Sequence, residues 1–116
     1  MKHEYRELKI WLNARALNKL IYLLSEDFPL EEKFGLKSQI RRASVSISSN
    51  IAEGSSHESN SMFIKYLNIA MGSLCEVESQ LYLCSDLNFL EKKQLIDLIK
   101  ETDKLKRMMI FHSKKH

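Results

Sequence analysis

Apolar residues recur at alternating steps of four and three along one long segment of the chain. They are Phe63, Leu67, Ala70, Leu74, Val77, Leu81 and Cys84. Side chains with this spacing lie along one narrow stripe of an α-helix. Because such a stripe must be removed from water, the pattern predicts a long helix that packs lengthwise against other helices.

Three further segments carry the same alternation. Their stripes are Ile10, Ala14, Leu17, Ile21, Leu24 and Phe28; Leu36, Ile40, Ala43, Ile47, Asn50 and Gly54; and Leu95, Leu98, Thr102, Leu105, Met109 and His112. With only 3 Gly and 1 Pro in 116 residues, the chain has little material for many short strands and turns. We therefore predict an all-α fold, an antiparallel up-down-up-down four-helix bundle in which residues 1–116 form a single domain.

Local signals set the ends of the expected helices. Pro29 lacks an N–H group and ends the first helix, and Gly35 joins a short turn to the second. Ser59 is the expected N-cap of the third helix, which residues 86–88 interrupt. The fourth helix is expected from about Glu91.

The second segment has a strand-like alternative. Ser44, Ser46 and Ser48 alternate with Val45 and Ile47, a period of two. No second strand-like run exists in the sequence to pair with it, so the helical interpretation is preferred.

The second and third segments also carry a family resemblance. The chain from about Leu8 onward resembles the four-helix-bundle proteins encoded by intervening sequences inside bacterial large-subunit (23S) rRNA genes. The matching positions are Phe28, Pro29, Gln39, Arg42, Ser46, Ile47, residues 50–54 (Asn-Ile-Ala-Glu-Gly), Phe63, Leu67, Ile69, Ala70, Gly72, Ser73, Leu74, Glu76, Gln80 and Leu81. Two positions depart from the family pattern: Ser48 stands where Pro is common, and Met71 stands where Arg is common, so a basic role at that position is not expected here.

The resemblance implies a ring-like homo-oligomer, a pentamer. It also includes a branch, the accessory variability determinant proteins of diversity-generating retroelements, whose basic pentamers bind nucleic acid and a reverse transcriptase. The family as a whole has no settled activity.

Two of the expected helices carry a second apolar stripe beside the first. These residues are Leu8, Leu12, Leu20 and Leu23 in the first helix and Ile64, Met71, Cys75 and Tyr82 in the third. A broad core face with scattered surface apolar residues would explain them. Self-association would also explain them, and we predict that they form an oligomer interface.

Several polar residues lie on or beside the stripes of the second and third segments: Gln39, Arg42, Asn50, Glu53, Glu76 and Gln80. We expect a structural polar network in which a partly buried Arg42–Glu76 pair fixes the helix register, with direct ligand binding as the alternative. Gly72 costs roughly 1 kcal/mol in mid-helix relative to Ala, which suggests a close backbone approach there.

The positive charge is concentrated near the C-terminus. Residues 91–116 contain eight Lys or Arg and four acidic residues, whereas the whole chain has a formal net charge of +3. The predicted nucleic-acid-binding residues are Lys100, Lys104, Lys106, Arg107, Lys114 and Lys115. A solvated helix face would look similar. Trp11 and the four Tyr form no basic–aromatic cluster, so any RNA contact is expected through charge and shape.

Other classes of function find little support in the sequence. The four His are dispersed, the two Cys are nine residues apart with no zinc pattern, and no phosphate loop or nucleophile elbow occurs. We expect no enzyme activity, no cofactor and no metal. No apolar run has the length of a membrane span, and no signal peptide is recognisable, so a cytoplasmic location is expected. The two functional hypotheses are an RNA- or ribonucleoprotein-associated binding protein and a structural module that docks a protein partner without binding nucleic acid.

Overall fold

The computed structural model describes residues 3–115, and this part of the chain consists of four α-helices and two short 3-10 helices without strands. The long helices are α1 (Lys9–Ser25), α2 (Leu36–Ser55), α3 (Asn60–Asp86) and α4 (Lys92–Lys114), and the 3-10 helices are η1 (Tyr5–Glu7) and η2 (Leu30–Glu32). The all-α, four-helix prediction is confirmed. The strand-like interpretation of residues 44–48 is excluded, because they lie inside α2.

The starts of α3 and α4 follow the predicted signals, whereas α1 ends at Ser25, before the predicted stop at Pro29. The Ser59 hydroxyl accepts a hydrogen bond from the Met62 backbone N–H at 3.3 Å, so Ser59 caps α3 as expected. Glu91 forms a capping box with Gln94 at the start of α4. Between α3 and α4 the backbone of Asn88 takes the left-handed conformation, with φ at 61°.

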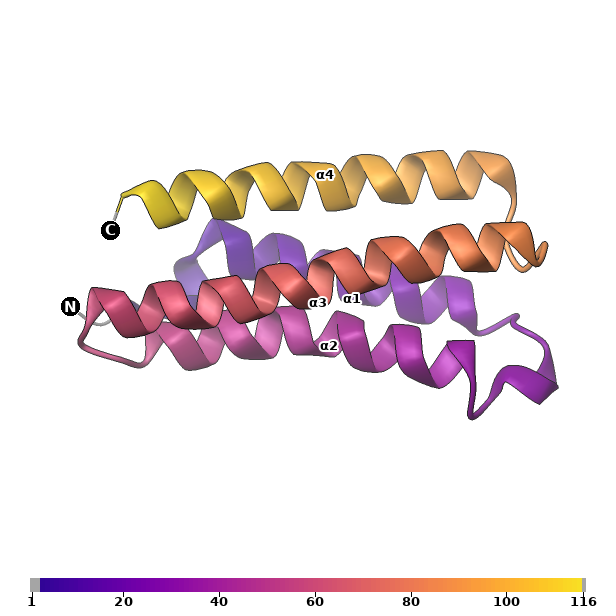
Figure 1. The fold of residues 1–116 in the computed structure, drawn as a ribbon, viewed down its shortest axis with the longest axis horizontal. Coiled ribbons are helices and arrows are strands. Elements are labelled where there is room, and N and C mark those ends of the chain that lie inside the picture. Colours follow the sequence, from indigo (N-terminus) through magenta and orange to yellow (C-terminus); the bar gives the residue numbers. More distant parts are fainter. Residues whose placement is uncertain (1–2, 116) are drawn as a thin grey trace.

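The helices form an elongated molecule of 45 × 24 × 20 Å, in which α2 contacts α1 and α3, and α4 contacts α3 and α1 (Figure 1). Between α2 and α3, Ser46 lies against Ser73, and Gln39 against Gln80. Residue numbers therefore rise along α2 where they fall along α3. The colour gradient in Figure 1 likewise reverses from each long helix to the next.

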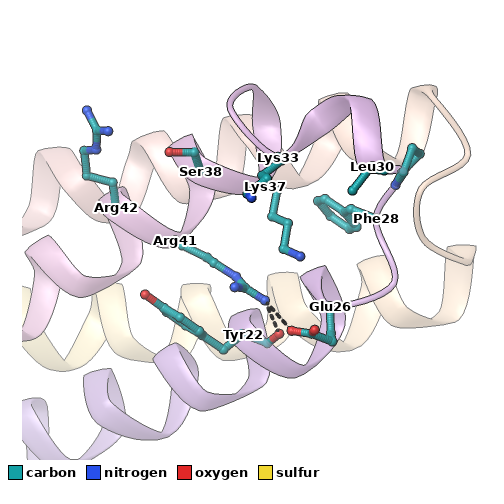
Figure 2. A pocket seen from close by; sticks show the side chains of 10 residues that line it. Tyr22, Glu26, Phe28, Leu30, Lys33, Lys37, Ser38, Arg41 and Arg42 are labelled. Carbon is teal, nitrogen blue, oxygen red and sulfur yellow. Dashed lines mark hydrogen bonds and ion pairs between the residues drawn. The ribbon is translucent and has the colours of Figure 1, made fainter.

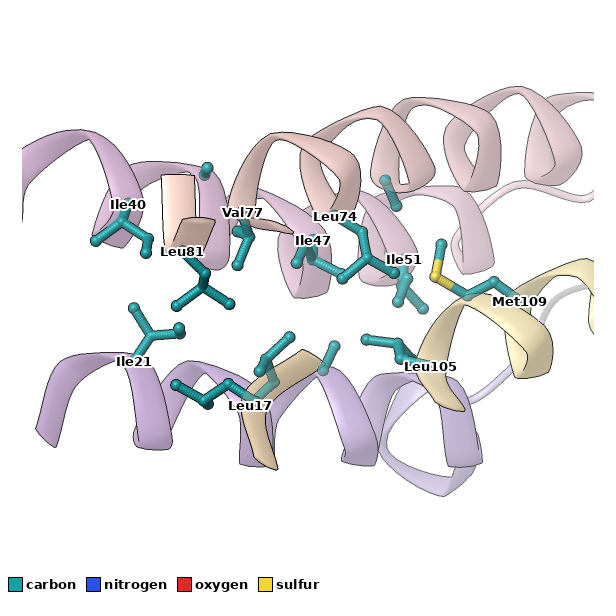
Figure 3. Close-up of a cluster of buried hydrophobic side chains, with 14 of the residues drawn as sticks. Leu17, Ile21, Ile40, Ile47, Ile51, Leu74, Val77, Leu81, Leu105 and Met109 are labelled. Atoms are coloured by element: carbon teal, nitrogen blue, oxygen red, sulfur yellow. The ribbon is translucent and has the colours of Figure 1, made fainter. Parts of the chain in front are cut away.

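The core lies along the shared axis of the four helices (Figure 3). All seven members of the α3 stripe are buried, as predicted. In the stripe from Ile10 to Phe28 only Leu24 is half-buried, and it still packs against the core. Fully buried large side chains from every long helix meet here, among them Ile21, Ile47, Leu74 and Leu105. The core of the protein is thus built by the stripes that the sequence shows.

The close approach of helices occurs at a different glycine from the one predicted. A Cβ atom at Gly54 would lie 2.7 Å from the Tyr66 Cβ and 3.1 Å from the Phe63 Cδ1, so α3 packs directly on this backbone position. A Cβ atom at Gly72 would meet nothing within 4 Å. The prediction for Gly72 is wrong, because Gly72 lies on the exposed side of α3 and not on its contact with α2.

Candidate functional site

The outer surface of α4 carries a row of cations. Lys100, Lys104, Arg107 and Lys114 follow one another at steps of four, three and seven, and Lys115 lies beside the last. This spacing places them on one side of the helix, away from the buried Leu98, Leu105 and Met109. All five are exposed, and none of them forms an ion pair with another residue in the range 3–115. We call these five residues the α4 basic face.

Lys106 does not belong to this surface, which corrects one of the predicted nucleic-acid contacts. Its ammonium donates a hydrogen bond to the Glu78 carboxylate of α3 at 2.5 Å, and only 31% of the Lys106 side chain is exposed. Thr102 donates to the same carboxylate at 2.7 Å. Lys106 lies at the edge of the exposed side of α4, next to α3. Its side chain therefore joins the two helices instead of facing solvent.

The environment of this ion pair shifts both pKa values. Burial alone would raise the pKa of Glu78, but the hydrogen bonds from Lys106 and Thr102 outweigh it and lower that pKa below its ordinary value. The hydrogen bond to Glu78 raises the pKa of Lys106 above its ordinary value. Both shifts favour the charged forms, so the pair stays ionised across the neutral range.

The predicted Arg42–Glu76 pair is absent from the described chain. Both residues are exposed, and no ion pair joins them. Gln80 is the buried residue at this position: its amide N–H lies 3.4 Å from the Glu76 carboxylate and 3.5 Å from the Gln39 side-chain oxygen. Arg42 comes directly before the buried Ala43 in the sequence but is itself exposed. Its long side chain therefore extends into water, where a guanidinium is best solvated.

The remaining members of the predicted polar network lie further along α2. Asn50 is half-buried, and its amide donates to the Ser46 carbonyl at 2.8 Å and to the Ser46 hydroxyl at 3.0 Å. The Ser46 hydroxyl lies 2.8 Å from that of Ser73 on α3. The Glu53 side chain is exposed. The sequence predicted a single network, but the structure has two small groups, one around Gln80 and one around Ser46. Arg42 and Glu53 belong to neither.

A pocket of about 700 Å³ opens beside the start of α2, where sequence analysis predicted no site (Figure 2). We call it the α2 pocket. Its walls come from the end of α1, the connection through η2 and the first two turns of α2. The lining residues are Tyr22, Glu26, Phe28, Pro29, Leu30, Lys33, Lys37, Ser38, Arg41 and Arg42. Four of these side chains are cationic, and one is acidic.

Arg41 forms the rigid wall of the α2 pocket. Its guanidinium donates to the Ser25 hydroxyl at 2.7 Å. The guanidinium also donates to the Tyr22 carbonyl at 3.0 Å and to the Glu26 carboxylate at 3.1 Å (Figure 2). It also lies 4.4 Å from the centre of the Tyr22 ring. The hydrogen bond from Arg41, with the nearby charge of Lys37, lowers the pKa of Glu26. The one acidic lining residue is thus already paired.

The other three cations of the α2 pocket carry no carboxylate partner within the described residues. Lys33, Lys37 and Arg42 form no ion pair, and in Figure 2 Lys37 points into the opening. The Glu32 carboxylate accepts a hydrogen bond from the Leu36 backbone N–H at 3.0 Å and so caps α2. Asp27 lies on the other side of α1, in a groove that faces α4. The α2 pocket is therefore a site of positive potential.

Two exposed phenylalanines accompany the basic surfaces. Phe34 is 87% exposed, and the Lys33 ammonium lies 5.5 Å from its ring centre. Phe111 is 63% exposed, and the Lys115 ammonium lies 5.0 Å from its ring centre. The sequence-based expectation concerned only Trp and Tyr and did not consider these two Lys–Phe contacts. Phe residues next to Lys at positions 33–34, and at 111 and 115 one helical turn apart, were the signal in the sequence.

The predicted interface residues have different surroundings in the single chain. Leu12, Leu20, Leu23, Cys75 and Tyr82 are exposed, Ile64 is half-buried, and Leu8 and Met71 pack against the protomer's own core. A groove of about 410 Å³ between α1 and α4 contains Leu20 and Leu23. A groove of about 540 Å³ between α3 and α4 contains Met71 and Cys75. Most of the predicted apolar surface is therefore present on the protomer.

The cysteines and acidic side chains of the described chain form no metal or disulfide site. Both cysteines are free: Cys75 is exposed and Cys84 is buried. Residues 3–115 contain no group of three or more His, Cys, Asp or Glu side chains that could hold a metal ion. Within the same range, no helix is both long enough and apolar enough to span a membrane.

The fold and its surfaces define an all-α, four-helix protein with basic patches on two sides. Residues 6–111 match the family model of the 23S rRNA-intervening sequence proteins. The chain therefore belongs to that family, as the resemblance indicated. A solved structure from Bacteroides thetaiotaomicron, described as a protein of unknown function from the S23 ribosomal protein family, has 25% sequence identity and a TM-score of 0.83. The similarity covers 90% of this chain and 95% of that one. No curated protein matches the chain.

Proposed function

We propose that this chain is a non-enzymatic, RNA- or ribonucleoprotein-associated protein of the cytoplasm. In this proposal it is an antiparallel up-down-up-down bundle that assembles into a ring-like homo-oligomer, a pentamer, and binds its partner by charge and shape. The observation that carries the proposal is the α4 basic face, a row of exposed cations without carboxylate partners in the described chain. Such a row matches the regular negative charge of a phosphate backbone.

The family membership supports a partner of this chemistry. The matched family is described by its origin in intervening sequences of 23S rRNA, and the similar Bacteroides protein is assigned to a ribosomal protein family. Neither description states an activity. The descriptions agree with the charge pattern, because an RNA-associated protein needs exposed cations.

The exposed apolar stripes support self-association. Leu12, Leu20 and Leu23 lie on the outer side of α1, and Tyr82 and Cys75 lie on the outer side of α3. Burying one Leu side chain is worth roughly 1.5–3 kcal/mol, so several of them per interface stabilise an assembly. A pentamer would carry five copies of the formal +3 charge of each chain. Repetition of the α4 basic face around a ring would raise the affinity for a polyanion.

A specific observation favours the second candidate, docking of a protein partner. The groove between α1 and α4 has a leucine floor of Leu20, Leu23, Leu24 and Leu98, and Asp27, Asp97 and Glu101 line its sides. This combination fits an apolar segment flanked by cations. It repels a phosphate backbone, so a protein that used only this groove would not need nucleic acid.

Sedimentation combined with RNA titration tests the proposal. The wild-type chain should sediment as an oligomer and bind RNA more weakly at higher salt. Leu12→Glu with Leu23→Glu should give monomers and lose most of the RNA affinity. Leu87→Glu changes an exposed apolar residue outside both stripes and serves as the control, with both properties retained. A monomeric wild type would end the assembly proposal, and an oligomer that ignores RNA at low salt would leave the docking alternative.

A further inference from the structure

We propose that the α2 pocket binds a phosphate that carries an unpaired base, with the phosphate between Lys33 and Lys37 and the base on the ring of Phe34. The ligand class is single-stranded RNA. The inference rests on the proposed function and extends it, because it names a second contact and the form of RNA that this contact selects.

The charges of the α2 pocket fit a phosphate. Arg41 is held by Ser25, Tyr22 and Glu26, so it forms a fixed wall and is not available as a ligand. Lys33 and Lys37 line the opening without ion-pair partners in the described chain, whereas the Arg42 side chain points away from it (Figure 2). A phosphate would supply the negatively charged partner that these side chains lack. A volume of about 700 Å³ lies within the usual range for small-ligand pockets and accommodates a nucleotide unit.

Phe34 provides the stacking surface. Its side chain is 87% exposed, which is unusual for a large apolar group, and no core residue covers it. Lys33 joins the two parts of the site, because it lines the pocket and its ammonium lies 5.5 Å from the Phe34 ring centre. An aromatic ring beside cations is the usual platform for an unpaired base. Bases in a duplex are already stacked and cannot use it, so the site selects single strands.

The α2 pocket and the α4 basic face are separate surfaces. No Cα atom of α2 lies within 8 Å of one in α4, and the closest neighbours of each helix are α1 and α3 (Figure 1). Loss of one surface should therefore leave the other in place. This separation allows the inference to fail while the proposed function holds.

The test measures affinity for four probes: a short unstructured single-stranded RNA, an RNA duplex of equal length, adenosine monophosphate and inorganic phosphate. Phe34→Ala should weaken binding of the single strand about tenfold and leave duplex binding unchanged. Phe34→Trp should restore it. Lys33→Gln with Lys37→Gln should lower the salt slope for the single strand by roughly 1.4, at about 0.7 per lost phosphate contact. The control, Arg15→Gln with Lys19→Gln, removes the same charge from exposed positions outside the pocket.

Single-strand affinity that is indifferent to Phe34→Ala, or equal slopes for the pocket and control variants, would overturn the inference while the α4 basic face still binds RNA. Adenosine monophosphate that binds the pocket more tightly than the single strand would overturn RNA as the ligand in favour of a free nucleotide. Binding of inorganic phosphate as tight as that of adenosine monophosphate would remove the role of Phe34. If wild-type protein binds no RNA, the proposed function fails and single-stranded RNA is excluded as the ligand of the pocket. The affinity for adenosine monophosphate then shows whether the pocket binds a free nucleotide.

Discussion

The α2–α3 contact and the packing of α4 are built on different principles. Helix α3 approaches the α2 backbone closely at Gly54, and small residues such as Ala43 and Ala70 are buried in the same core. Helix α4 leaves a groove on either side, towards α1 and towards α3, and the Lys106–Glu78 pair joins it to α3. The comparison indicates that α2 and α3 pack closely to fix the fold, whereas α4 packs more openly and, in the proposed function, presents surface to partners.

The largest effect is expected where α3 meets the α2 backbone. Gly54→Val would place its Cβ 2.7 Å from the Tyr66 Cβ, an atom next to the backbone that cannot rotate away. Overpacking typically costs about 1–3 kcal/mol in the free energy of unfolding, and we expect Gly54→Val at the upper end of that range. Urea denaturation followed by circular dichroism measures it. An unchanged midpoint would show that the two helices are free to separate here.

The two cysteines should differ strongly in reactivity. Burial, together with the charge of Glu32, raises the pKa of Cys84 to about 11, whereas Cys75 is exposed. At pH 8 a thiol reagent should label Cys75 of the Leu12→Glu, Leu23→Glu monomer and react with Cys84 at least about a hundredfold more slowly, because the thiolate fraction of Cys84 is small and access is blocked.

The same experiment sharpens the assembly proposal. In the Leu12→Glu, Leu23→Glu monomer, Cys75 should react at the rate of an exposed thiol, and in the wild-type oligomer it should be protected. Equal rates for Cys75 in both proteins would place it outside the interface. Rapid labelling of Cys84 in the native protein would contradict the buried position that α3 gives it.

The ion pair between α3 and α4 should contribute a smaller amount. Glu78→Gln and Lys106→Met, alone and together, form a double-mutant cycle with an expected coupling of about 1–2 kcal/mol. Additive single effects would show that the pair does not hold α4. Thr102→Val removes a second hydrogen bond to Glu78 and should cost less than either change.

The pH dependence of this contribution follows from the two pKa shifts. The pKa of Glu78 is lowered in the folded protein, so its contribution is present above the ordinary value of 4.5 and is lost as the pH falls through the folded value. The pKa of Lys106 is raised, so its contribution is present below the ordinary value of 10.5 and is lost as the pH rises through the folded value. The coupling should therefore be constant at neutral pH, begin to weaken in acid near pH 4.5 and disappear once the pH falls below the lowered pKa of Glu78.

The smallest effect, and of opposite sign, is expected at the second glycine of this pair of helices. A side chain at Gly72 meets nothing within 4 Å, so Gly72→Ala should raise the free energy of unfolding by about 0.5–1 kcal/mol through helix propensity and a less flexible unfolded chain. Chemical denaturation next to Gly54→Val measures the contrast. A loss of stability in Gly72→Ala would mean that another chain covers this position.

The sequence predicted the fold well because burial follows helix periodicity. The stripe from Phe63 to Cys84 is buried along its whole length, and the Ser59 cap lies where its hydroxyl can reach the first turn of α3. Close packing was harder to locate, since a spacing pattern does not say which of two glycines faces the neighbouring helix. What distinguishes Gly54 from Gly72 is the direction that each position faces around the axis of its own helix.

The candidate sites were less predictable because they depend on where long side chains end. Arg42 and Glu76 belong to facing helices, yet both extend into solvent, and the shorter Gln80 occupies the buried position. Lys106 differs from Lys104 by two residues, and that rotation pairs it with Glu78. The α2 pocket required the bend through η2, which brings the end of α1 beside the start of α2. Residue spacing within one helix carries no signal of such a bend.

The central claim is that the α4 basic face contacts RNA, and the salt dependence of RNA binding tests it most directly. Two triple variants remove the same charge, Lys100→Gln with Lys104→Gln and Arg107→Gln from the face, and Arg15→Gln with Lys19→Gln and Lys65→Gln from exposed positions elsewhere. For a single-stranded RNA, the first should lower the slope of log affinity against log salt by roughly two, and the second should leave it close to wild type. Equal slopes for the two variants would contradict the assignment of RNA binding to α4.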